Sequence, residues 1–123
     1  MREGNINLLD LDFEYKLWKN RLALFVKEIE ILRTRNKEME NCCKDDQLNT
    51  VELMVLDEHQ DQLTKLLNLI KTQEQEIQYY NKDFPITKSH DYYKEHVNLR
   101  KKMDSISKIH FDKIADLVNE LGI

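Results

Sequence analysis

Residues 11–39 read LDFEYKLWKNRLALFVKEIEILRTRNKEM, and apolar side chains recur in this segment every three or four positions. Two interleaved lines repeat every seven residues. One line is Leu11, Trp18, Phe25, Leu32 and Met39, and the other is Leu8, Tyr15, Leu22, Ile29, Asn36 and Cys43. This spacing places both lines on one face of an α-helix, as in coiled coils. The segment therefore predicts a long helix over about residues 8–42, capped by Asn7 or Asp10.

Two further segments carry the same seven-residue pattern. Asn49 and Glu52 have the spacing of a capping box, so a second helix is expected over about residues 50–83, ended by Pro85. Ser89 is the expected N-cap of a third helix over about residues 90–121. The second helix has the apolar line Leu56, Leu63, Ile70, Ile77 and Phe84. The third has the core line Tyr92, His96, Leu99, Met103, Ile106, His110, Ile114, Leu117 and Leu121.

Residues that break helices are rare in this chain. It contains no glycine between Gly4 and Gly122, and Pro85 is its only proline. Glycine and proline supply the backbone angles of tight turns and irregular catalytic loops, so a chain without them favours long helices. Short connections make neighbouring helices antiparallel. The predicted fold is all-α: a long antiparallel three-helix bundle with coiled-coil-like heptad packing, in which residues 1–123 form a single domain.

Composition restricts the function classes. With 19 basic and 23 acidic residues the net charge is −4, which argues against nucleic acid as a partner because phosphate binding needs clustered Lys and Arg. The longest apolar run, Leu22 to Val26, is far too short to span a bilayer, and no signal peptide is evident. Cys42 and Cys43 are adjacent and unsuited to pairing with each other. We therefore expect a cytoplasmic protein without a membrane partner.

Three histidines fall on the predicted core lines, namely His59, His96 and His110. Folding the chain at hairpins near residues 46 and 86 brings His110 opposite Glu28 or Glu30, with His59 about a turn away. These side chains are candidate metal ligands, because helical bundles hold metals between facing helices. However, the chain lacks Glu-x-x-His, and no histidine has a ligand four residues later. The alternative is neutral histidines that form structural hydrogen bonds.

Polar residues on the seams suggest a structural role. Asn36 lies near His59 in the predicted register, and Gln73 lies near the indole of Trp18. We expect a hydrogen bond in each pair, because a polar seam residue fixes register and partner number. Phosphotransfer domains offer another use for His96, but they need an exposed histidine, and this one is predicted to face inward.

Two further groups of side chains are candidate interaction surfaces. Leu17, Leu24 and Ile31 form a second apolar line on the first helix. This line either widens the face that contacts two neighbouring helices or docks a helix from another copy of the chain. The second group surrounds Pro85 and either caps that end of the bundle or binds a partner. It consists of Tyr79, Tyr80, Tyr92 and Tyr93.

The chain resembles a group of uncharacterised small bacterial proteins made of long helices. The resemblance is carried by Trp18, Phe25 and Glu28-Ile29, by Glu58-His59-Gln60-Asp61-Gln62, and by the histidine-bearing segment 90–96. It covers nearly the whole chain and implies an all-helical fold. The group has no established activity to transfer.

These observations favour a non-enzymatic, cytoplasmic interaction or scaffold protein that binds another copy of itself or another helical protein. No catalytic motif and no cofactor site stands out. A bundle that holds a metal or small ligand through its core histidines is the first alternative, and a phosphotransfer-like signalling domain is the second.

Overall fold

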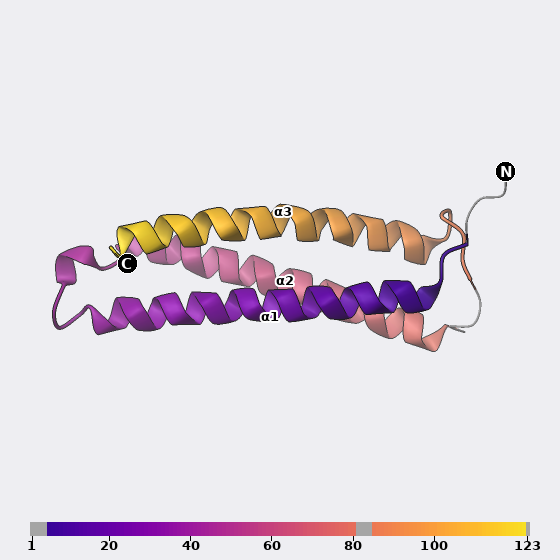
Figure 1. Ribbon diagram of the computed structural model, residues 1–123, viewed down its shortest axis with the longest axis horizontal. Helices are drawn as coiled ribbons and strands as arrows, with labels where there is room; N and C mark the ends of the chain where they lie inside the picture. Colours follow the sequence, from indigo (N-terminus) through magenta and orange to yellow (C-terminus); the bar gives the residue numbers. More distant parts are fainter. Residues whose placement is uncertain (1–4, 81–84, 123) are drawn as a thin grey trace.

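The computed structural model describes residues 5–80 and 85–122. It contains three long helices, α1 (Leu8–Glu38), α2 (Thr50–Tyr79) and α3 (Asp91–Glu120), and a short 3-10 helix, η1 (Lys44–Asp46). The long helices lie side by side and alternate in direction, so the molecule is an elongated rod (Figure 1). Each of the three packs against the other two. The predicted all-α three-helix bundle is confirmed.

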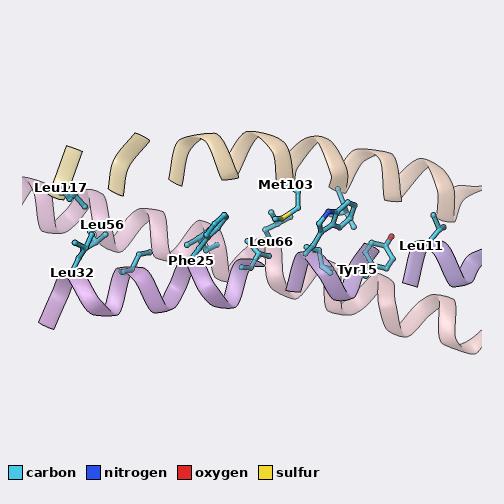
Figure 2. Close-up of a cluster of buried hydrophobic side chains, with 14 of the residues drawn as sticks. Leu11, Tyr15, Phe25, Leu32, Leu56, Leu66, Met103 and Leu117 are labelled. Carbon is cyan, nitrogen blue, oxygen red and sulfur yellow. The ribbon is translucent and has the colours of Figure 1, made fainter. Parts of the chain in front are cut away.

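The core of the rod is formed by the seven-residue lines that the sequence shows. Figure 2 shows Leu11, Phe25, Leu66, Met103 and other side chains from all three helices pointing into the space between them. The α1 seam is buried from Leu8 to Leu32. The core therefore runs along the full length of the bundle in successive layers, as heptad packing requires.

Capping side chains explain where the helices begin. The Asn7 Oδ1 accepts a hydrogen bond from the backbone N–H of Leu9 at 2.9 Å and so caps α1. At the start of α2, Asn49 accepts from the N–H of Glu52 and the Glu52 side chain accepts from the N–H of Asn49. This reciprocal pair is the expected capping box.

The first helix ends earlier than predicted, at Glu38 instead of about residue 42. The chain then turns back, and Met39 and Leu48 are buried against the end of the bundle. Asn36 holds this loop, because its Oδ1 accepts from the N–H of Leu48 and its backbone oxygen accepts from Gln47. Burying these two apolar side chains ends the helix. The predicted bond between Asn36 and His59 does not occur among the described hydrogen bonds; the Asn36 Oδ1 bonds the loop at Leu48, and the His59 Nε2 lies against His110.

The other predicted helix ends also need correction. Helix α2 ends at Tyr79 because Tyr80 has extended backbone, and the remaining predicted positions 81–83 lie outside the described residues. Helix α3 begins at Asp91, and its N-cap is His90, not Ser89. The His90 Nδ1 accepts from the N–H of Tyr92 at 3.1 Å, a role that a serine hydroxyl was expected to take. Beyond α3, Gly122 adopts a φ of 69°, typical of helix termination by glycine.

A short bridge, which the sequence did not reveal, ties the two chain segments at the α2–α3 turn end. Ile6 and Ile86 exchange two backbone hydrogen bonds, of 2.6 and 2.8 Å, in antiparallel orientation. Ile86 is also buried. The bridge thus connects the segment that enters α1 with the segment that leads into α3.

The outer faces of the helices are largely polar. Ion pairs link α1 to α2, including Lys19 to Glu74 at 2.6 Å and Arg33 to Asp57 at 2.6 Å. Across the described part of the chain, no helix has both the length and the apolar character needed to cross a membrane.

The core layers predict a clear contrast between two leucines of α2. Leu63 is fully buried, whereas Leu69 is 44% exposed. We expect Leu63→Ala to lower the free energy of unfolding by about 2–5 kcal/mol, because it leaves a cavity between three helices. The matched control Leu69→Ala should cost less than about 1 kcal/mol. Urea unfolding followed by circular dichroism measures both, and equal losses would contradict the described packing.

Candidate functional site

The outer face of α1 carries an apolar stripe, defined here as Phe13, Leu17, Leu24 and Ile31. These side chains are between 45% and 63% exposed. The buried seam of the same helix already contacts α2 and α3, so the stripe does not widen that contact. Of the two roles predicted for Leu17, Leu24 and Ile31, the widened core face is therefore wrong. Docking of another helix stays a prediction.

A second feature is the His110 relay, defined as His59, His110 and Glu28. One residue comes from each helix, and the three meet in the core. The His59 Nε2 lies 2.9 Å from the His110 Nδ1, and the His110 Nε2 lies 2.9 Å from the Glu28 Oε1. Both imidazoles are buried, and the His110 ring stacks on Phe25 with 4.0 Å between ring centroids. Of the two predicted partners of His110, the structure selects Glu28, and His59, which was expected about a turn away, contacts His110 directly.

The proton positions in the relay follow from its chemistry. A carboxylate only accepts, so the His110 Nε2–H donates to Glu28. The His110 Nδ1 of a neutral ring then accepts from the His59 Nε2–H. Burial lowers the pKa of His59 to about 4, with smaller contributions from His110 and Lys113. His59 is therefore held neutral in the core, and the line of contacts from it through His110 ends on the Glu28 carboxylate.

The relay is linear, and this shape matters for metal binding. Glu28 and His59 contact opposite nitrogens of His110, so the three groups do not converge on one point. His96 lies on the same helix as His110, about 21 Å away at 1.5 Å per residue. Within residues 5–80 and 85–122, no group of three or more His, Cys, Asp or Glu side chains is placed to hold a metal ion.

His96 belongs to a separate cluster, the His96 cluster, with Glu14 and Arg100. The Glu14 Oε1 lies 2.5 Å from the His96 Nε2 and 2.6 Å from the Arg100 Nη2. Burial raises the pKa of Glu14, but hydrogen bonds from Arg100 and His96 outweigh it and leave that pKa below its usual value. The pKa of His96 is lowered by burial, which Glu14 only partly offsets.

The surroundings of His96 leave little room for phosphoryl transfer. Its ring is fully buried and lies between Trp18 and Tyr15, with centroids 4.8 and 4.6 Å away. An incoming phosphoryl donor needs an exposed nitrogen, so this geometry disfavours that alternative. The Trp18 ring packs on His96. The predicted bond from Gln73 to the indole does not occur among the described hydrogen bonds.

The four tyrosines near Pro85 do not form one surface. Tyr80 contacts His90 and Tyr92 edge-on, with centroids 5.6 and 5.4 Å away. Tyr92 and Tyr93 are half-buried against the core, whereas Tyr79 is 93% exposed. Three of these rings therefore help close this end of the bundle, and Tyr79 alone points fully outward.

An open groove runs between α2 and α3 beside the relay. It has a volume of about 620 Å³. Its walls are mainly apolar, with Leu66, Ile106 and Ile109 among them, and His59 also lines it. Lysines and Glu58 stand at its edges. The groove lies beside the His59 end of the relay, but its mixed charges select no particular ligand.

Sequence reasoning missed three of these residues. Phe13 stands four positions before Leu17, which is helical spacing and was a readable signal. Glu14 and Glu74 gave no signal, because a helix with many charged residues always offers accidental pairs. Only the structure shows that Glu14 bonds His96 and that Glu74 is buried beside Lys19.

Comparison with known proteins adds no assignment. No known family, no curated protein and no solved structure matches this chain. The resemblance to small bacterial helical proteins therefore stays a prediction, and function has to be argued from the residues themselves.

The buried His59 predicts that acid destabilises the bundle. The unfolded chain binds a proton at this imidazole near pH 6.5, whereas the folded chain does so only near pH 4. The contribution of neutral His59 to the free energy of unfolding is therefore complete above pH 6.5. It is lost between pH 6.5 and pH 4, at up to about 1.4 kcal/mol per pH unit.

Urea unfolding between pH 4.5 and pH 8 measures this loss. The pKa of His96 is also lowered, so protonation of His96 destabilises the fold in acid as well. The control is therefore His59→Gln, which keeps His96 and removes the titration of His59. We expect a shallower dependence on pH in this variant. Identical slopes in the two proteins would show that His59 is not held neutral by burial.

Proposed function

We propose that this protein is a non-catalytic helical interaction module that self-associates through the apolar stripe on the outer face of α1. The supporting observation is that Phe13, Leu17, Leu24 and Ile31 are exposed on one face of a helix whose opposite face is already buried. Apolar side chains aligned over several turns are typical of surfaces that bind another helix.

The length of the stripe suits a helical partner. From Phe13 to Ile31 it extends about 27 Å at 1.5 Å per residue. Isolated exposed apolar residues are common on protein surfaces, but an aligned series of four large side chains is the kind of patch that marks an interface. A second copy of the chain always offers a matching apolar helix, so self-association is the simplest use of this surface.

The proposal includes the cytoplasm as the compartment. Cys42 and Cys43 both carry free thiols, and Cys42 is exposed. Exposed thiols persist in a reducing compartment.

A charge placed in the stripe tests the proposal. We expect the unmodified protein to have the mass of a dimer or larger assembly by multi-angle light scattering at micromolar concentration. Leu24→Lys should shift it to the monomer mass, because burying an unpaired ammonium at the interface is costly. Helix content by circular dichroism should be unchanged, since Leu24 is 54% exposed in the single chain.

The matched control is Leu69→Lys, which makes the same change at an exposed leucine of α2. It should leave the mass unaltered. A monomeric unmodified protein, or an assembly that Leu24→Lys does not weaken, would overturn the proposal.

A further inference from the structure

The residues that border the apolar stripe on both sides repeat every seven positions, and all of them except Ala23 are charged. On the side toward α3 the border is Glu14, Arg21, Glu28 and Arg35. The contacts of Glu14 and Glu28 with α3 histidines establish this side. On the side toward α2 the border is Lys16, Ala23, Glu30 and Lys37. Lys16 establishes that side, because it lies 3.6 Å from Glu74 of α2.

We propose that two copies of the chain pair their α1 helices in antiparallel orientation, with the two-fold axis beside Leu24. This inference rests on the proposed function and specifies the partner and its geometry. Reversing the stripe about Leu24 leaves Leu24 opposite itself and brings Leu17 opposite Ile31 of the second copy. Leu17, Leu24 and Ile31 therefore meet one another along the seam, as helix pairing requires, and Phe13 lies beyond them at each end of the seam.

The borders match in this orientation. On the α3 side, Arg21 lies beside Glu28 of the second copy, and Glu14 beside Arg35. Two-fold symmetry repeats each pair, so this side alone forms four attractive contacts. Glu28 can take part without losing His110, because a carboxylate has two oxygens and His110 uses Oε1. Arg21 is exposed in the single chain.

The residues on the border toward α2, and the polar residues within the stripe, also find suitable partners in the antiparallel register. Lys16 lies beside Glu30 of the second copy, and the small Ala23 lies beside its own symmetry mate, where the helices come closest. The two polar residues that interrupt the stripe, Asn20 and Lys27, also meet across the interface, where the ammonium can donate to the amide oxygen.

A parallel pairing fails the same comparison. It would bring Lys27 opposite Lys27 along the seam. Parallel helices pair border residues five positions apart, so Lys16 would lie beside Arg21 of the second copy, and only Glu30 would meet an opposite charge, that of Arg35. Charges that border a helix interface set the orientation of the partner. The antiparallel arrangement is therefore the one that the charges of α1 select.

Distances between two spin labels test the orientation. Ala23→Cys and Glu30→Cys place a label on the same border, in a background with Cys42→Ser and Cys43→Ser so that no other thiol reacts. In the antiparallel dimer the two labels at position 23 face each other and broaden the continuous-wave spectrum. The labels at position 30 are separated along the axis by about 21 Å.

Each outcome is informative when it is read with the light-scattering mass of the labelled protein. Short distance at position 23 and long distance at position 30 support the proposal. A dimer with short distances at both positions is parallel, which overturns the orientation but keeps the self-association. A dimer with long distances at both uses another face, which overturns this inference and the proposed surface. A monomer mass for the unlabelled, unsubstituted protein overturns the proposed function as well.

Charge reversal gives an independent test on the unlabelled protein. Arg21→Glu replaces two attractive contacts with two repulsive ones and should raise the dimer Kd about tenfold at low salt. The matched control is Lys101→Glu, the same change of charge at an exposed position of α3. An unchanged Kd for Arg21→Glu, or an equal change in both variants, would contradict the antiparallel register.

Discussion

Burial of the α1 seam between α2 and α3 is the interaction on which the rest of the structure depends. The seam repeats every seven residues from Leu8 to Leu32, so it stays on one side of a helix of 31 residues. Two other helices with the same repeat cover it along its length. Once that side is covered, Phe13, Leu17, Leu24 and Ile31 are left on the outer surface of α1, and their exposure makes the stripe a candidate interface.

Polar groups inside the core fix how the three helices align with one another, at some cost in stability. The His110 relay joins all three helices at one level, and the His96 cluster joins α1 to α3 at another. A shift of any helix by one turn would leave buried nitrogens without partners, which is unfavourable. These side chains therefore fix the register that uniform apolar layers would leave free. The same reasoning explains why the histidines resemble ligands without converging on a metal.

Much of this fold could be predicted from the sequence because heptad spacing and capping residues act locally. The three helices, the capping box at Asn49 and the level of His110 all follow from spacing. The end of α1 did not, since it depends on Leu48 folding back onto the core from ten residues away. The partners of Asn36 and Trp18 also could not be predicted. Hairpin midpoints fix register only to about a turn, and one turn changes which side chains touch. The apolar line Leu17, Leu24 and Ile31 could be recognised in the sequence, but only the structure shows that these side chains are exposed and do not belong to the core.

Accessibility of Trp18 tests the central claim most directly, because it is the only tryptophan and lies on the buried seam, 4% exposed, against His96. Acrylamide quenching of its fluorescence compares the folded chain with the chain in concentrated urea. The described bundle predicts quenching that is several-fold weaker in the folded protein. Equally strong quenching in both states would show that the α1 seam is open to solvent and would contradict the account.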